Sequence, residues 1–235
     1  MEIFKTDKFI DMTHTIASPL FDNAENPWGV LPLIGEFIKG LGPYLGDDYI
    51  QKGENIWIHN TAVIAPTASI NGPCIIGPET EVRHCAFIRG SAVIGANCVI
   101  GNSVEVKNSI ISDECEVPHF NYVGDSILGY KAHMGAGAIT SNVKNDKSNV
   151  EVSFPLGKID TKLRKFGAVI GDYTQVGCNC VLNPGTMIGR NCNIYPLQSI
   201  RGMIGDNVIY KAAGRTTERI KVKKPNPRGA MEMRG

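Results

Sequence analysis

An aliphatic residue returns at every sixth position through the middle of this 235-residue chain. The series begins with Ile58, Ile64, Ile70, Ile76, Val82, Ile88, Ile94, Ile100 and Val106. The residue four positions after each aliphatic one is small or branched, as in Ala62, Ala68, Cys74, Thr80, Ala86, Ala92, Cys98 and Val104. A six-residue period fits neither an α-helix nor an isolated strand. It is typical of a parallel β-helix, in which each hexad forms one side of a triangular coil. The period therefore predicts an all-β solenoid.

The extent of the hexad period divides the chain into segments. We predict an N-terminal cap over residues 1–54, a coil over 55–212 with an insertion at 143–167, and a basic tail over 213–235. A solenoid buries its core coil by coil, so the usual size limit of a globular core is relaxed. The tail contains the basic cluster Lys221–Lys224 and is either a solvated extension or a ligand contact.

The predicted cap contains one helical pattern. Apolar residues recur there at spacings of three and four, at Leu33, Ile34, Phe37, Ile38 and Leu41. This spacing predicts an amphipathic helix over residues 30–41, which nearby glycine and proline residues end. The end of a solenoid exposes core and unpaired strand edges. We therefore expect the helix to cover the first coil, with contact to a partner as the alternative.

Composition excludes several classes of protein. The net charge is +1 and aromatic residues make up 7% of the chain, so no nucleic-acid-binding footprint is visible. No apolar run is long enough to cross a bilayer, and the N-terminus lacks the apolar core of a signal peptide. We expect a cytoplasmic protein with no membrane contact.

The cysteines fit the same location. Five of them, Cys74, Cys98, Cys115, Cys180 and Cys192, occupy the small position of a hexad. There we expect compact core residues, not disulfide partners. The remaining arrangements, His84-Cys85 and Cys178-Asn-Cys180, lack the paired spacing of a zinc site, so we expect no metal.

The period is interrupted at three places. The step from Val106 to Ile111 and the step from Val123 to Leu128 are five residues long, and after Asn142 the period is lost until Ile170. Removing one residue from a side tightens a corner and changes which side chain projects there, although a simple packing adjustment has the same signature. Long loops in compact domains are usually functional or disordered, and we expect a short hairpin or an arm at this insertion.

Two cations occupy equivalent positions in successive coils. Arg89 and Lys107 are eighteen residues apart, and each directly follows an aliphatic hexad residue. Stacked cations repel one another unless an anion lies between or beside them. Glu105 is one candidate anion, and a bound phosphate is the other, because guanidinium and ammonium groups both bind phosphate oxygens.

Two further polar residues are candidates for chemistry. His119 lies between the two five-residue steps, with Tyr122 and Asp125 close by in sequence. Histidine titrates near neutrality and can accept a proton from a nucleophile, although a lone histidine is often structural. Asn142 ends a glycine-containing run, where its amide can both donate to and accept from a ligand or can serve the turn before the insertion.

Four elements of the sequence, with the spacing between them, resemble a known enzyme family. They are Arg89, Lys107, Pro118–Asp125 and Gly135–Asn142. This set is similar to the acetyltransferase half of the bifunctional bacterial enzymes that make UDP-N-acetylglucosamine, and the similarity covers residues 80–212 with both five-residue steps. The resemblance implies a left-handed parallel β-helix, a homotrimer, acetyl-CoA as co-substrate and an amino-sugar phosphate as acceptor. The uridylyltransferase half of those enzymes has no counterpart in the residues before the coil, because about 54 residues cannot hold such a domain.

The resemblance also implies roles for individual residues. His119 corresponds to the general base, and Asn142 to the asparagine beside the reacting amine. Arg89 and Lys107 correspond to residues that hold the sugar phosphate, and Tyr122 corresponds to a tyrosine that contacts the substrate. Ala136 and Cys178 fall where the family contacts acetyl-CoA, largely through its backbone.

Three positions depart from the family pattern. His133 stands where the family has a substrate-binding asparagine, Val143 replaces a tyrosine, and Cys178 replaces a serine. These departures leave three hypotheses open. The chain is an acetyltransferase for an amino-sugar phosphate such as glucosamine-1-phosphate, a catalytic coil with a different acceptor, or a non-catalytic sugar-nucleotide-binding or trimerising module.

Overall fold

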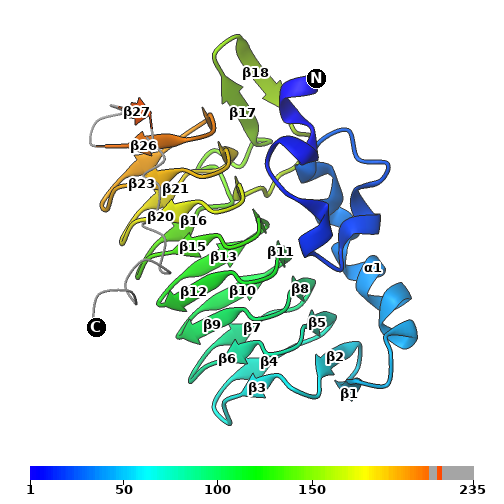
Figure 1. The fold of residues 1–235 in the computed structure, drawn as a ribbon. Coiled ribbons are helices and arrows are strands. Elements are labelled where there is room, and N and C mark those ends of the chain that lie inside the picture. Colours follow the sequence, from blue (N-terminus) through cyan, green and yellow to red (C-terminus); the bar gives the residue numbers. More distant parts are fainter. Residues whose placement is uncertain (212–215, 219–235) are drawn as a thin grey trace, which may run out of the picture.

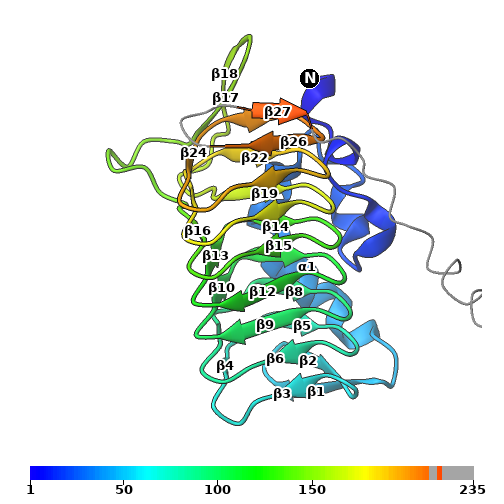
Figure 2. The same ribbon diagram turned by 60° about the vertical axis from the view of Figure 1, so that its left-hand side comes forward.

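The fold is a left-handed parallel β-helix flanked by an N-terminal cap (Figures 1 and 2). The computed structural model describes residues 1–211 and 216–218. Apart from residues 216–218, the predicted basic tail lies outside the described residues. Three sheets form the sides of the coil, and neighbouring strands within them are parallel except at β1–β2 and β26–β27. We name the three sides face A, face B and face C in the order in which the chain crosses them.

The strands of the three faces are short, as the hexad period requires. Face A consists of β1 (Tyr49–Gly53), β2 (Ile56–His59), β5 (Cys74–Ile76), β8 (Ala92–Ile94), β11 (Ser109–Ile111), β14 (Ile127–Leu128), β19 (Ala168–Ile170), β22 (Thr186–Ile188) and β25 (Met203–Ile204). Face B consists of β3 (Val63–Ile64), β6 (Glu81–Val82), β9 (Val99–Asn102), β12 (Glu116–His119), β15 (His133–Met134), β20 (Gln175–Val176), β23 (Asn193–Ile194), β26 (Val208–Tyr210) and β27 (Thr216–Glu218). Face C consists of β4 (Ser69–Ile70), β7 (Phe87–Ile88), β10 (Glu105–Lys107), β13 (Tyr122–Gly124), β16 (Ile139–Thr140), β21 (Val181–Leu182) and β24 (Ser199–Ile200).

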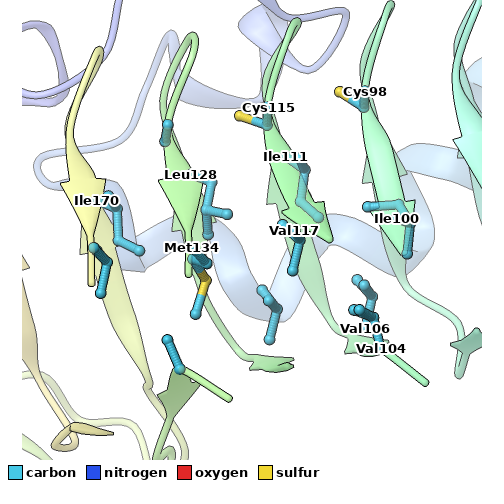
Figure 3. Close-up of a cluster of buried hydrophobic side chains, with 14 of the residues drawn as sticks. Cys98, Ile100, Val104, Val106, Ile111, Cys115, Val117, Leu128, Met134 and Ile170 are labelled. Carbon is cyan, nitrogen blue, oxygen red and sulfur yellow. The ribbon is translucent and has the colours of Figure 1, made fainter. Parts of the chain in front are cut away.

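The hexad residues fill the interior of the coil, as the period predicts. Figure 3 shows Ile100, Val117 and Met134 in successive coils, with Val106 beside Ile100 in the same coil, and all four are fully buried. The five cysteines of the small position are buried there as free thiols, which confirms their prediction as core residues. Burial raises the pKa of Cys98 to about 12, because the thiolate would have to form in an apolar interior. These thiols are therefore packing groups and not nucleophiles.

The cap covers face A and not the end of the coil, so the expectation that it covers the first coil is wrong. Most face A strands carry an apolar residue that packs outside the coil, as in Ile75, Val93, Ile110, Ile127, Val169 and Met187. These residues form a second core with Phe4, Phe9, Trp28, Ile34 and Ile38 of the cap. A strand that is buried on both sides carries consecutive apolar residues. The apolar runs in these strands are the sequence signal of a covered face.

The cap contains short helical segments. They are 3-10 helices at Glu2–Phe4, Thr6–Lys8, Met12–His14, Ser18–Phe21, Pro27–Leu33 and Gly42–Tyr44, and the α-helix α1 at Ile34–Leu41. The predicted helix over residues 30–41 is therefore α-helical only in its second part. Pro32 lacks an N–H group and disfavours α-helical geometry at Leu31, which explains the later start.

The insertion leaves the coil as a hairpin, as we expected. Strands β17 (Glu151–Phe154) and β18 (Gly157–Asp160) pair antiparallel and project beside the N-terminus (Figure 1). The insertion packs on the cap both near the hairpin turn, where the ring of Phe154 lies 5.2 Å from Phe4, and at its return to the coil, where the ring of Phe166 lies 5.8 Å from Trp28. None of the helices in residues 1–211 has the length and apolar character needed to span a bilayer.

Candidate functional site

All three interruptions of the period fall on the edge between face C and face A. Each five-residue step turns this corner with a single residue in the left-handed region, Asn108 at φ 46° and Asp125 at φ 49°. Asparagine and aspartate adopt this conformation more readily than other residues with a side chain. The insertion leaves the same edge after Asn142, and Gly167 returns to it by donating its N–H to the Asp125 carbonyl at 2.8 Å. The shortened corners therefore bring Asn108, Asp125 and Asn142 into adjacent coils.

Asp125 is the centre of this edge. Its side chain is 5% exposed, and its carboxylate accepts from Lys107 Nζ at 3.2 Å and from Asn108 Nδ2 at 2.8 Å. Asn142 Nδ2 donates to the same carboxylate. A carboxylate so far removed from water requires several donors. Asp125 therefore fixes the position of one cation and two amides.

The cations Arg89 and Lys107 stack as their spacing predicts, and each has a carboxylate partner. Arg89 contacts Glu105 at 2.6 Å, and Lys107 contacts Asp125. The sequence left two candidate anions beside these cations, Glu105 and a bound phosphate. The structure shows that Glu105 pairs with Arg89. The Arg89 and Lys107 side chains nevertheless retain unused N–H donors, and with Gly90 they border an open hollow of about 290 Å³. A phosphate in this hollow would join existing ion pairs.

Tyr122 and Asn142 contact each other in the coils that follow Lys107 along the same edge. Asn142 Nδ2 donates to Tyr122 Oη at 3.1 Å as well as to Asp125. The carboxylate can only accept, so the amide nitrogen must face it, and Asn142 Oδ1 remains available to accept. Burial and the nearby Asp125 charge raise the pKa of Tyr122, so its hydroxyl stays protonated and can donate to a ligand.

Gly124 makes the position of Tyr122 possible. A Cβ atom at Gly124 would collide with the Tyr122 hydroxyl and ring, which lie over its Cα. Substitution of Gly124 by Ala should therefore displace the ring and break the contact with Asn142. We expect kcat of the transfer reaction proposed below to fall about tenfold, while the melting temperature changes by a few degrees at most. Steady-state kinetics and thermal unfolding of G124A test this, and unchanged kcat would show that the Tyr122 position is irrelevant to turnover.

A second group of candidate residues lies on the edge between face B and face C. His119, Ala136 and Cys178 occupy this edge in successive coils, joined by Gly137 N–H donating to His119 O at 3.0 Å and Asn179 N–H donating to Ala136 O at 2.8 Å. The side chains of His119 and Cys178 are exposed. The structure therefore brings the predicted base beside the predicted acetyl-CoA contacts.

Asn121 supports this edge from inside the coil and was missed by the sequence reasoning. It is 3% exposed, its Oδ1 accepts from His119 N–H at 3.0 Å, and its Nδ2 donates to the carbonyls of Gly135 and Ala138. It occupies the small position four residues after Val117, where a buried amide is unusual in this chain. A polar residue at a core position of the repeat was the signal that could have identified it.

The candidate residues thus form separate groups in one copy of the chain. Arg89, Lys107, Tyr122 and Asn142 gather at the C–A edge, and His119 lies at the B–C edge. Five residues of extended chain cross face C between the two edges, which is about 16 Å. His133 lies on face B, where its Nε2 is 4.0 Å from the Glu116 carboxylate. Among residues 1–211 and 216–218, no group of three or more His, Cys, Asp or Glu is placed to hold a metal ion.

Two family models match the coil. The C-terminal domain of GMPPB matches residues 70–154, and the six-repeat bacterial transferase hexapeptide model matches residues 167–196. Together they cover most of the coil, and the first also includes strand β17 of the hairpin.

Several curated proteins are similar over most of the chain. The bifunctional protein GlmU of Methanococcus maripaludis (strain DSM 14266) is 37% identical over 169 residues, which are 71% of this chain and 41% of that protein. GlmU of Methanococcus vannielii is 34% identical over 70% of this chain and 40% of that protein. The chain thus spans about two fifths of the length of these relatives. The putative uncharacterized acetyltransferase YaiX of Escherichia coli K12 is 33% identical over 188 residues, which are 72% of this chain and 80% of that protein.

Solved structures with the same kind of coil are more distant. A hexapeptide transferase family protein from Anaplasma phagocytophilum is 18% identical with a TM-score of 0.47, covering 63% of this chain and 80% of that one. Perosamine N-acetyltransferase from Caulobacter crescentus, solved with CoA and GDP-perosamine, is 16% identical with a TM-score of 0.35, covering 69% of this chain and 56% of that one. The hexad core, the matching repeat model and the similarity to most of YaiX agree, and this chain belongs to the hexapeptide-repeat transferase family.

Proposed function

We propose that the protein is an acetyl-CoA-dependent N-acetyltransferase that acts on an amino-sugar phosphate of the glucosamine-1-phosphate kind. The observation that carries the proposal is the Asp125-centred cluster, which orders Lys107, Asn142 and Tyr122 along one edge of the coil, where Arg89 and Lys107 border a hollow. A site of this kind offers cations for a phosphate and neutral polar groups for sugar hydroxyls and an amine. The similarity to GlmU over 70% of the chain supports the same reading.

The acceptor would bind at the C–A edge. Arg89 and Lys107 would hold its phosphate through charge-assisted hydrogen bonds. The Tyr122 hydroxyl would donate to the sugar, and the free Oδ1 of Asn142 would accept from the amine. Because Asp125 and Tyr122 both fix the Asn142 amide, the Oδ1 atom of Asn142 would be oriented before the substrate arrives. His133 lies on face B and would contact only a ligand that extends around the coil.

His119 would remove a proton from the amine as its nitrogen attacks the thioester carbonyl, and the C–S bond would then break to release CoA, which takes up the proton as a thiol. Acetyl-CoA would supply the activated acetyl group. It would bind along the backbone around Ala136 and Cys178. The Gly177 N–H already donates to Ile194 O at 2.8 Å. The Ala136 N–H has no backbone acceptor among the described residues, so it is the better donor to a developing oxyanion.

A second copy of the chain would complete this site. His119 and Asn142 lie at opposite edges of face C, about 16 Å apart, which is too far for one copy to place both groups at one amine. A closed trimer would bring the B–C edge of one copy to the C–A edge of its neighbour, and cyclic trimers are a common closed symmetry. Analytical ultracentrifugation tests the assembly.

A thiol-release assay tests the proposed reaction. Purified protein with acetyl-CoA and a panel of amino-sugar phosphates should release CoA thiol with one acceptor preferred, and Arg89→Gln should raise KM for that acceptor about tenfold. Lys52→Gln, an exposed cation on β1, is the matched control. If no acceptor supports thiol release at saturating acetyl-CoA, the proposed reaction is wrong.

A second candidate function is a non-catalytic sugar-nucleotide-binding module. His133, Val143 and Cys178 favour it, because they depart from the enzymatic pattern. A thermal-shift comparison separates the two functions, because a ligand that binds only the folded state raises the melting temperature. A response to sugar nucleotide without any response to acetyl-CoA would favour the binding module.

A further inference from the structure

The C–A edge carries a second cationic hollow above the site. Arg201 follows β24 directly, and the strand ladder places it in register with Asn183 and Ser141 below it. A hollow of about 320 Å³ lies here, and Arg201, Asn183, Ser141 and Lys144 line it. The hollow also borders Val143, so it begins next to Asn142. It is separate from the hollow at Arg89 and Lys107, because four strand spacings, about 19 Å, separate Lys107 from Arg201.

The charge balance of this hollow differs from that at Arg89. Arg201 is exposed, and no carboxylate of the described residues forms an ion pair with it. Lys144 is held in place by the Ser148 hydroxyl at 2.6 Å and lies 3.6 Å from Asp146, the one carboxylate that lines the hollow. Two cations against one carboxylate leave the hollow net positive. Unlike Arg89, Arg201 has no ion-pair partner within residues 1–211 and 216–218 to displace before it binds an anion.

A buried amide and a neutral donor complete the lining. Asn183 is 9% exposed and is anchored by its Nδ2, which donates to Ser199 Oγ at 3.0 Å and to Ile200 O at 2.8 Å. The Ser141 hydroxyl forms no hydrogen bond within the described part of the chain and can donate. A guanidinium, an ammonium and a hydroxyl around one hollow match the oxygens of a phosphate group.

We infer that Arg201 and Lys144 form a second phosphate subsite, which takes the phosphates of a nucleotide-type substrate at the proposed transferase site. The inference rests on the proposed function for the identity of the ligand. Two substrates carry the required chemistry: the phosphates of acetyl-CoA, and the diphosphate of a nucleotide-linked amino sugar. Because the two hollows lie on opposite sides of Asn142, two substrates can approach it from opposite directions, each held by its own phosphate.

Calorimetric titration of the full-length protein tests the subsite. The ligands are acetyl-CoA, S-acetylpantetheine, a UDP-linked amino sugar and glucosamine-1-phosphate, measured on wild type, Arg201→Gln and Lys144→Gln. Loss of one charge-assisted phosphate contact should raise Kd about tenfold for acetyl-CoA or for the UDP-linked sugar, and the affected ligand identifies the source. S-acetylpantetheine, which has no phosphate, should bind all three proteins equally. Lys158→Gln on the hairpin, paired with Glu151, is the matched control.

These titrations, together with the thiol-release assay, distinguish a wrong assignment of the subsite from a wrong assignment of the reaction. Equal affinity of wild type, R201Q and K144Q for both phosphate-containing nucleotides, with unchanged melting temperatures, would overturn the subsite even if acetyl transfer proceeds. An Arg201-dependent affinity in a protein that transfers no acetyl group would support the subsite and reject the reaction.

Discussion

Substitution of His119 by Ala should lower kcat of acetyl transfer by about 100- to 10,000-fold, the usual contribution of a positioned general base. The imidazole is exposed and lies at the B–C edge beside the Ala136 backbone, so its removal takes away a proton acceptor and little packing. We therefore expect the melting temperature and the assembly state of H119A to match those of wild type. A thiol-release assay measures kcat, and thermal unfolding measures the melting temperature.

His84 provides a matched control for this substitution. It occupies the same edge two coils earlier, and Asn102, which lies between them, is in register with His119. The His84 imidazole contacts the Thr67 hydroxyl at 2.6 Å and has no role in the proposed reaction. His84→Ala should retain full activity. Equal turnover of H119A and wild type would remove His119 from the mechanism, whereas equal losses in H84A and H119A would indicate a structural effect of this edge.

Substitution of Phe166 by Ala should lower the free energy of unfolding by about 3–5 kcal/mol, the usual cost of removing a buried aromatic ring. Phe166 is fully buried in the second core, with its ring 5.8 Å from Trp28 of the cap. Its N–H also donates to the Asn142 carbonyl at 3.0 Å, where the insertion returns to the coil. Loss of the ring should therefore loosen the cap, the hairpin base and the position of Asn142 together.

Chemical denaturation of F166A measures the stability, and kinetics below the unfolding transition measure the site. We expect kcat to fall together with stability in F166A, and Phe166→Leu to lose less of each because it keeps most of the apolar contact. Leu156→Ala at the hairpin turn is the control, since this side chain is 90% exposed and should change stability by less than about 0.5 kcal/mol. A loss in F166A no larger than in L156A would show that the cap does not support Asn142.

Much of the fold was predictable from periodicity. The aliphatic hexad positions point inward in every coil, because a six-residue side repeats the same inward position, and the small position fits the corner between two sides. The hairpin was predictable only as a departure from the coil. The cap was misplaced because the outward-facing apolar residues of face A, such as Ile75, Val93 and Ile110, were not used as the signal of a covered face.

The candidate site was predictable in its residues and not in its grouping. The spacing of Arg89 and Lys107 placed them correctly in one column. His119 lies between the two five-residue steps in sequence, but the shortened corners act at the other edge of face C, where they stack Asn108 on Asp125. The position of a residue between two short steps in the sequence does not show which edge of the triangular coil the residue occupies.

The sequence by itself determined the coil, its interior and the columns in which residues repeat, because the backbone geometry of a hexad fixes where each position points. Only the tertiary structure decided what surrounds those columns. It placed the cap on face A, paired both cations with carboxylates and made Asp125 the anchor of Lys107 and Asn142. These outcomes depend on contacts between residues of different coils and segments, which a local period does not encode.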